Sequence, residues 1–368
     1  MLMPSVAVIG TRGYPSYYGG FETAVRKIAP YLVNSGWDVT VYGRRGTTRP
    51  DDESIERAVT TRVTRGLETR SLSTLSYGMT STLDAAVRRP DVALVMNVAN
   101  GYFLPLLKAR RIPTLVNVDG IEWERGKWSR LAQRVFRIGA EFTARFASGL
   151  VFDSHAIEAY WSQTFGVAGT YIPYGGEVPP PLPLPEGLAH RGYVLLVARF
   201  VAENSVPEFF EAVPAIAARH PVVIVGSSGY GGELDEAASI LAADHPSVSW
   251  LGHVSNDGLL LSLWQHAGVY FHGHSVGGTN PALIQAMAAG APIVARDTIY
   301  NREVLGPAGN FVTPDSDAIA KSILGLMETS VEEREDAGQA NVERAKQHYS
   351  WAQVCADYDR ALRELVRR

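Results

Sequence analysis

The chain has 368 residues, which is more than one ordinary domain of roughly 100–200 residues and enough for two. Apolar residues make up 46% of it and charged residues 20%, a balance that excludes a disordered chain. The 34 basic residues are outnumbered by 38 acidic ones, which argues against a nucleic-acid-binding protein, and the single cysteine, Cys355, excludes a disulfide framework or a thiolate metal site.

Short apolar runs alternate with helical stretches through the first half of the chain. The run SVAVIG (5–10) precedes a glycine-rich loop, a helix from about Phe21 to Asn34 that ends at Gly36, and a strand DVTVYG (38–43). Strand, loop and helix in this order predict βαβ units and a parallel sheet buried on both faces. The further strands expected in this half are VALVM (92–96), TLVNV (114–118) and GLVF (149–152).

A proline-rich segment separates this half from a second one. VPPPLPLPEG (178–187) holds five prolines, which lack backbone donors and suit neither a helix nor a central strand. We therefore predict an N-terminal domain over 1–177, a linker over 178–191, a C-terminal domain over 192–348, and a terminal helix over 349–368 with the N-terminal domain as its candidate packing partner. The strands expected in the second half are YVLLVA (193–198), VVIVG (222–226), VSWLG (248–252), GVYFHG (268–273) and PIVA (292–295).

These patterns predict an α/β fold of two Rossmann-like domains that face each other across a cleft. Ligands of open parallel sheets bind at the carboxyl ends of the strands, so the loops after the strands are where we expect the functional residues. The chain opens without the basic head and apolar stretch of a signal peptide, and it has no run of about 18 apolar residues. We expect a cytoplasmic protein, with any membrane contact peripheral at the inner face.

The first candidate motif is GTRGYPSYYGGFET (10–23). Gly19 and Gly20 allow a ligand close to the backbone just where a helix begins, and a helix N-terminus attracts anions. The spacing is not the G-x-G-x-x-G dinucleotide fingerprint, which disfavours a nicotinamide dehydrogenase. The alternative is a flexible turn before a helix.

The second motif, NVDGIEWERGKWS (117–129), follows a predicted strand. Asp119 and Glu122 are carboxylates that can accept sugar hydroxyls, and Trp123 and Trp128 can stack on the apolar face of a sugar. The alternative is a salt-bridged loop with two packing tryptophans, since aromatic residues usually belong to the core.

The second domain supplies two phosphate-binding candidates. Arg199 follows the first strand of this domain, and a guanidinium pairs with phosphate through two hydrogen bonds, while Asn204 can add a neutral contact. In HGHSVGGTNPALIQAMAAG (272–290) a glycine-rich loop leads to a helix with proline at its first position. Backbone N–H groups from Gly278 to Asn280 can cradle phosphate oxygens, and Gln285 can reach a ribose hydroxyl.

Two further features have structural explanations that we favour. His272 and His274 have no acidic or further histidine neighbours and are poor metal ligands. The stretch 125–146 mixes arginines with aromatic residues and fits either a helix on an anionic membrane or, preferably, a helix that packs its aromatic residues into the first domain. Its arginines are Arg130, Arg134, Arg137 and Arg145, and its aromatic residues are Trp128, Phe136, Phe142 and Phe146.

The chain resembles bacterial rhamnosyltransferase-type enzymes of glycosyltransferase family 4 over nearly its whole length. The resemblance rests on four motifs in the same order: the first and second motifs above, the loop GHSVGGTNP, and NREVLG (301–306). The resemblance implies a GT-B fold, a retaining reaction without an essential metal or other cofactor, and a nucleotide-activated sugar as donor, often dTDP-rhamnose, with UDP- or GDP-sugars as alternatives. It also implies an enzyme that often works on lipid-linked acceptors at the cytoplasmic face of the membrane.

Two positions depart from the wider superfamily. Asn204 stands where those enzymes have a lysine, and Gly277 and Gln285 stand where they have two glutamates eight positions apart. The asparagine and the glycine-rich loop fit the rhamnosyltransferase-like subgroup, whereas Gln285 does not. A neutral amide can still bind a ribose hydroxyl, though more weakly than a carboxylate.

We therefore predict a glycosyltransferase that moves a hexose or deoxyhexose to a saccharide, lipid-linked saccharide or small-molecule acceptor. The alternatives are an epimerase of the same fold and a non-catalytic nucleotide-sugar-binding protein. The predicted site residues are Asp119, Glu122 and Arg199 for catalysis; Gly19, Gly20, Arg199, Asn204, Gly277, Gly278, Thr279 and Asn280 for the donor diphosphate and sugar; Gly226, His253 and Gln285 for the nucleoside; and Tyr18, Trp123 and Trp128 for the acceptor.

Overall fold

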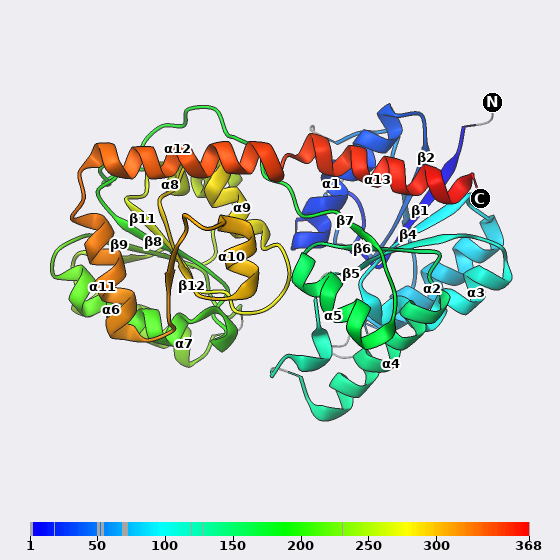
Figure 1. Cartoon of the computed structure of the whole chain (residues 1–368), viewed down its shortest axis with the longest axis horizontal. Coiled ribbons are helices and arrows are strands. Elements are labelled where there is room, and N and C mark those ends of the chain that lie inside the picture. Colours follow the sequence, from blue (N-terminus) through cyan, green and yellow to red (C-terminus); the bar gives the residue numbers. More distant parts are fainter. Residues whose placement is uncertain are drawn as a thin grey trace. The chain divides into compact units, whose positions relative to one another are not determined.

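The computed structural model describes residues 3–17, 19–49, 52, 55–67, 73–118, 120–126, 128–229 and 231–367. The chain forms two compact units, one made of Met1–Tyr174 with Trp351–Arg368 and the other of Gly175–Ser350. Figure 1 shows each unit as a layered arrangement of helices around a sheet. The predicted class, α/β with two Rossmann-like domains, is confirmed for both units.

The first unit holds a seven-stranded sheet in the order β3-β2-β1-β4-β5-β6-β7, with all neighbouring strands parallel. Every residue of β4 and β5 is buried, as expected for strands covered on both faces. The strands are β1 (Ser5–Ile9), β2 (Asp38–Gly43), β3 (Thr60–Val63), β4 (Val92–Met96), β5 (Thr114–Val118), β6 (Gly149–Phe152) and β7 (Thr170–Tyr171).

Helices of this unit pack on the sheet and on one another. Helix α13 runs beside α1 and contacts β4 and β5, so the last helix of the chain completes the first unit (Figure 1). Trp37 donates to Asp359 at 2.6 Å and Asn117 donates to Tyr358 at 2.5 Å, which fastens α13 to this sheet. The helices are α1 (Gly20–Asn34), α2 (Ser73–Arg88), η1 (Val98–Phe103), α3 (Leu104–Ala109), η2 (Glu122–Glu124), α4 (Arg130–Phe146), α5 (His155–Phe165) and α13 (Trp351–Val366).

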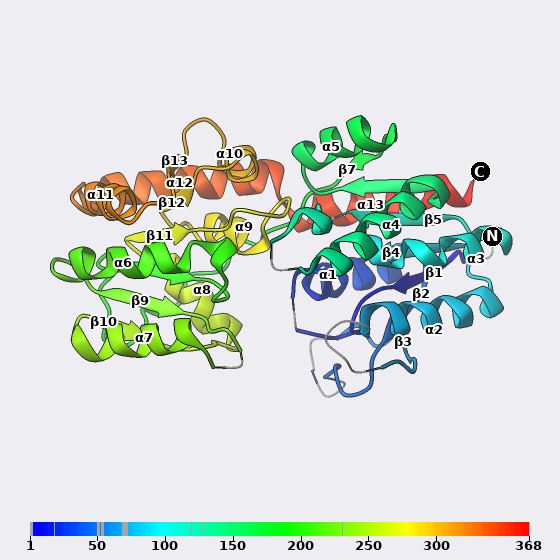
Figure 2. The same cartoon turned by 90° about the horizontal axis from the view of Figure 1, so that it is seen from below.

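The second unit repeats the architecture with a six-stranded parallel sheet in the order β10-β9-β8-β11-β12-β13 (Figure 2). Buried side chains of β8, β9 and β11 form one apolar core with the inner faces of α6 and α11. The strands are β8 (Val194–Val197), β9 (Val222–Val225), β10 (Val248–Trp250), β11 (Val269–His272), β12 (Ile293–Arg296) and β13 (Asn310–Val312). The helices are η3 (Ala202–Asn204), α6 (Val206–Ala217), α7 (Glu233–Asp244), α8 (Asp257–His266), α9 (Pro281–Ala288), α10 (Ile299–Leu305), α11 (Ser316–Met327) and α12 (Val331–His348).

The predicted linker is not separate from the domains. The units divide after Tyr174 rather than at residue 177, and the proline-rich stretch belongs to the second unit. Its backbone is held by α8: the Ser262 hydroxyl donates to the Pro183 carbonyl at 2.6 Å, and the side-chain oxygen Oε1 of Gln265 accepts from Leu182 N–H at 2.7 Å. Prolines leave carbonyl groups without ladder partners, and polar side chains of α8 satisfy them here.

No helix in the described parts of the chain is long and apolar enough to span a membrane.

Candidate functional site

Each sheet has one point at which the strand order reverses. In the first unit it lies between β1 and β4, and in the second between β8 and β11. Consecutive connections leave such a point in opposite directions, which opens a crevice beyond the carboxyl ends of the two strands. The loops after β1, β8 and β11 carry the predicted phosphate-binding residues, whereas the second motif follows β5, and Gly226 and His253 follow β9 and β10.

Arg199 lies in the loop after β8 and its side chain is exposed. The Arg199 carbonyl accepts hydrogen bonds from the Asn204 side-chain nitrogen and from Val201 N–H, both at 2.9 Å. Asn204 is only 3% exposed, so its amide shapes the loop that presents Arg199. The prediction gave Asn204 a direct ligand contact; the structure places it behind the loop instead.

The loop after β11 is tied to the loop after β8. Ser275 donates its N–H and its hydroxyl to the Glu203 carbonyl at 2.9 and 2.8 Å, and Ser205 donates to the Gly273 carbonyl at 2.9 Å. A Cβ on Gly273 would lie 2.2 Å from the Asn204 carbonyl oxygen, so only glycine fits this approach. The two loops at the switch point therefore form one hydrogen-bonded body.

Helix α9 begins at the end of this loop. Asn280 is its N-cap and accepts from Ala282 N–H at 2.9 Å, while Pro281 takes the first helical position. Gly277 has a φ of +96°, a conformation that favours glycine, and Gly278 and Thr279 are buried just before the cap. The first turn of α9, described in full, carries no acidic residue. Its amide groups and its dipole therefore favour an anion.

The residues predicted to contact the nucleoside are not gathered by one loop. Gln285 lies one turn into α9, where its side-chain nitrogen donates to the Glu177 carbonyl at 2.9 Å. Gly226 follows β9, its carbonyl accepts from the Trp250 indole at 2.9 Å, and its backbone approaches Ala198. His253 follows the edge strand β10 and is exposed.

His272 ends β11 and is fully buried. Its Nδ1 lies 2.9 Å from the Tyr270 hydroxyl, and its ring stacks on His274 with centroids 4.4 Å apart. Burial, with the neighbouring His274 in second place, holds the pKa of His272 well below its usual range, so the ring is neutral. Within the described residues no group of three or more histidine, cysteine, aspartate and glutamate side chains is arranged to hold a metal ion.

Asn301 and Arg296 complete this body and were not predicted as site residues, although Asn301 opens the NREVLG motif. Asn301 is 3% exposed and donates to the His274 carbonyl at 3.0 Å and to the Arg296 carbonyl at 2.8 Å. Arg296 donates to the Ser205 hydroxyl at 3.0 Å. The loops after β8, β11 and β12 are thus joined.

In the first unit, the loop after β1 leads to α1, with Gly19 as the N-cap and Gly20 as the first helical residue. Glu22 in the first turn is 6% exposed and accepts from Arg12 N–H at 3.2 Å. A buried carboxylate therefore already occupies this helix N-terminus, which disfavours the anion site predicted at Gly19 and Gly20. Tyr18 lies outside the described residues.

The second motif forms a salt-bridged loop with two packing tryptophans, which was the alternative interpretation of its sequence. The Glu122 carboxylate pairs with Arg125 at 2.9 Å and accepts from the Trp128 indole at 2.8 Å. Trp123 is 9% exposed and donates to Tyr160 at 3.1 Å from within an aromatic cluster that includes Trp161. These three residues stabilise a loop, and Asp119 lies outside the described residues.

Helix α4 also packs its aromatic side chains into the first unit. Phe142 contacts Tyr102 with ring centroids 5.6 Å apart, and Trp128 contacts Phe136 at 5.2 Å. Arg137 pairs with Glu141 at 3.3 Å and lies 4.5 Å over the Phe165 ring. The exposed residues of this helix are Arg130, Leu131, Arg134, Glu141 and Arg145.

Comparison with known families places both units in the same class of enzyme. The family model for the "Glycosyl transferase 4-like domain" matches residues 19–175, and the family model for "Glycosyl transferases group 1" matches residues 191–329. None of the curated protein sequences compared with the chain matches it.

Solved structures with the same fold cover almost the whole chain. Sucrose-phosphate synthase from Thermosynechococcus elongatus is similar over 98% of this chain and 99% of its own, with 18% identity and a TM-score of 0.80. Anabaena HepE in complex with UDP is similar over 98% and 100%, with 17% identity and a TM-score of 0.76. The trehalose-6-phosphate synthase OtsA is similar over 98% and 99%, with 13% identity and a TM-score of 0.74. At these identities the likeness shows the fold, which is that of GT-B glycosyltransferases.

Proposed function

The chain belongs to the group 1 glycosyltransferases, and we propose that it transfers a hexose or deoxyhexose from a nucleoside diphosphate sugar with retention of configuration. The acceptor class is a saccharide, a lipid-linked saccharide or a small molecule. The four sequence motifs favour a rhamnose-like sugar carried by dTDP. HepE binds UDP and UDP-glucose, which supports a uridine or thymidine nucleotide as donor.

One observation supports the donor site above all: the two units differ at the helix that follows the switch-point loop. Helix α1 begins with a buried glutamate, Glu22, that already accepts a backbone N–H group. Helix α9 has a neutral asparagine cap and no acidic residue in its fully described first turn. A diphosphate is stabilised by the second arrangement and repelled by the first, so we assign it to the second unit.

Charge development on the leaving group explains how this site would catalyse transfer. As the glycosidic bond breaks, negative charge grows on the diphosphate, and the amides from Gly278 to Asn280 together with Arg199 stabilise it. Both groups belong to loops that are already hydrogen bonded to each other, so little reorganisation accompanies the reaction. We assign no protein nucleophile: the acceptor hydroxyl attacks the anomeric carbon on the face that the diphosphate leaves, and the bond from that carbon to the diphosphate oxygen breaks. The departing diphosphate takes the hydroxyl proton, and configuration is retained.

The remaining site residues take supporting roles in this proposal. Glu122 holds its loop through Arg125 and Trp128, and Asp119 remains the candidate that orients the acceptor or the donor sugar. The site needs no metal, because backbone amides and a guanidinium supply the positive charge. Lipid-linked acceptors would bring the protein to the inner membrane face, where the exposed arginines of α4 are available for peripheral contact.

A thermal-shift panel with dTDP, UDP, GDP and their glucose and rhamnose derivatives tests the donor assignment. A ligand that binds only the folded protein at 100 times its dissociation constant adds about 2.7 kcal/mol of stability, a readily measured rise in Tm. Arg199→Ala is expected to remove most of the rise. Arg219→Ala, which removes an exposed arginine paired with Glu328, is the matched control and should leave it unchanged.

Two results would count against the proposal. If no nucleotide raises the Tm, or if Arg199→Ala behaves like the control, the donor site is not where we assign it. If the protein converts a nucleotide sugar into its epimer without any acceptor, the epimerase alternative is correct and the proposed transfer is wrong.

A further inference from the structure

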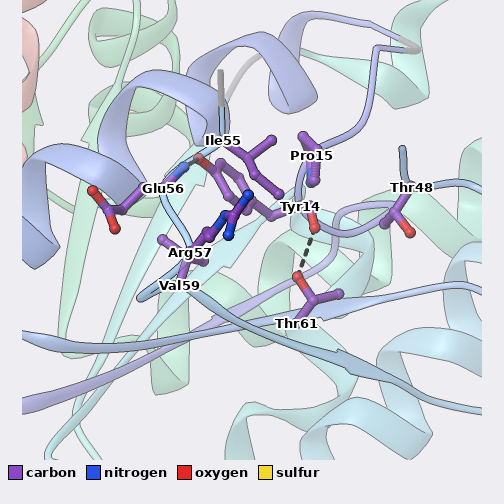
Figure 3. Close-up of a pocket in the computed structure, with 8 residues that line it drawn as sticks. All are labelled: Tyr14, Pro15, Thr48, Ile55, Glu56, Arg57, Val59 and Thr61. Carbon is purple, nitrogen blue, oxygen red and sulfur yellow. Dashed lines mark hydrogen bonds between the residues drawn. The ribbon is translucent and has the colours of Figure 1, made fainter. Parts of the chain in front are cut away.

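The first unit contains a pocket of about 400 Å³ that none of the predicted site residues lines (Figure 3). It lies between the loop after β1 and the segment that joins β2 to β3. Its volume is that of a small-molecule site rather than a packing defect. The lining residues are Tyr14, Pro15, Thr48, Ile55, Glu56, Arg57, Val59 and Thr61.

Hydrogen bonds hold the walls of this pocket in place. Thr61 donates to the Tyr14 carbonyl at 2.6 Å, the bond drawn in Figure 3, and Glu56 N–H donates to the Tyr14 hydroxyl at 2.9 Å. Arg49 N–H donates to the Pro15 carbonyl at 3.0 Å. These bonds link the β1 loop to two separate parts of the 44–61 segment, so the pocket is formed without a ligand.

The lining combines hydroxyl groups with apolar surfaces. Burial raises the pKa of the Tyr14 phenol, so its hydroxyl stays protonated; it accepts from Glu56 and keeps its own proton for a further bond. Thr48 adds another hydroxyl, while Pro15 and Ile55 supply apolar surface. Hydroxyls beside apolar walls suit a pyranose ring, which has polar edges and an apolar face.

The pocket lining carries one guanidinium, that of Arg57, and one carboxylate, that of Glu56. Arg57 is exposed and forms no hydrogen bond or ion pair with any residue that the structure describes. The Glu56 carboxylate has a partner of its own, since it accepts from Ala58 N–H at 3.0 Å. The guanidinium of Arg57, which has no described partner, is therefore available to an anionic group on a bound molecule.

We propose that this pocket binds a pyranose that carries an anionic group, either a carboxylate or a phosphate, with Arg57 as the residue that selects the charge. We assign this sugar to the acceptor, an assignment that rests on the proposed function, because the second unit holds the donor in that proposal. Binding itself does not depend on transfer.

Calorimetric titration of the full chain with three probes, D-glucuronic acid, D-glucose 6-phosphate and D-glucose, tests the proposal. We expect at least one anionic probe to bind about tenfold more tightly than glucose, and comparison of the two identifies the anion. Arg57→Ala should reduce that affinity to the level of glucose. Arg45→Ala, a substitution of an exposed arginine in the same segment that does not line the pocket, should leave it unchanged.

A second variant excludes an effect of charge alone. Thr48→Val keeps the charge and the size of the side chain but removes a lining hydroxyl, and it should weaken all three probes to a similar extent. The proposal is wrong if no probe binds, if glucose binds as tightly as both anionic probes, or if the Arg57 and Arg45 variants lose affinity equally. The dTDP thermal shift, measured on the same variants, reports the donor site separately: its persistence in Arg57→Ala shows that a failure here is not a failure of the proposed function.

Discussion

Gly226 is the position at which a single methyl group should disturb the second unit most clearly. It follows β9 with a φ of +134°, and a Cβ there would lie 1.8 Å from the Ala198 carbonyl oxygen. Carbon and carbonyl oxygen normally approach to roughly 3.3 Å, so the backbone of one loop must move by about 1.5 Å in Gly226→Ala. Overpacking of this kind costs about 1–3 kcal/mol, and the strained φ adds a similar amount.

Gly229 provides a control in the same loop. Its φ of +83° is also unfavourable for alanine, but no described atom lies within 4 Å of the position of a Cβ. Gly229→Ala should therefore cost only the strain, about 1 kcal/mol. Urea unfolding followed by tryptophan fluorescence suits this test, because the Trp250 indole donates to the Gly226 carbonyl. Equal losses of stability in the two variants would refute the close-approach argument.

Two further predictions concern the joined loops. His272 stays neutral in the folded protein, so below a pH of about 6.5 its ring binds a proton only in the unfolded chain. The free energy of unfolding should therefore fall with acidification by up to about 1.4 kcal/mol per pH unit. In His272→Gln the loss between pH 7.5 and 5.5, measured by urea unfolding, should be smaller; an identical loss would contradict the neutral histidine. Asn301→Ala removes two buried hydrogen bonds, so it should lower the free energy of unfolding by about 1–3 kcal/mol and reduce the nucleotide-induced rise in Tm. Asn310→Ala removes one hydrogen bond of 3.5 Å and is the control, which should change neither quantity.

Most of the strands that the sequence predicted are buried along nearly their whole length, although β2 and the edge strand β10, which were also predicted, each contain an exposed residue. VALVM and TLVNV coincide with β4 and β5, in which every residue is buried. VALVM is apolar throughout, whereas TLVNV includes Thr114 and Asn117, each 2% exposed. The short strands β3, β7 and β13 were missed. They lie at or near the sheet edges and contain polar residues such as those of TTRV, so neither hydrophobicity nor alternation identifies them.

The sequence predicted which loops carry the candidate site residues but not their hydrogen bonds. The loops lie at the carboxyl ends of the strands because chain order and strand order together fix the switch points. The partner of a polar side chain depends on which distant backbone lies beside it. Gln285 bonds to the Glu177 carbonyl, 108 positions earlier, and Asn204 turns inward to its own loop. The sequence contains no local signal for either choice.

Ser205 is the residue at which the joined loops meet. It has a φ of +52°, an unfavourable conformation for a residue with a Cβ, and it is fully buried. Such a conformation persists only where surrounding contacts fix it. Its hydroxyl donates to the Gly273 carbonyl and accepts from Arg296, so one oxygen atom links the loops after β8, β11 and β12. Strain at this residue is thus coupled to the geometry of the Arg199 loop and the α9 N-terminus, and the proposed stabilisation of a leaving diphosphate at these two places would require such preorganisation.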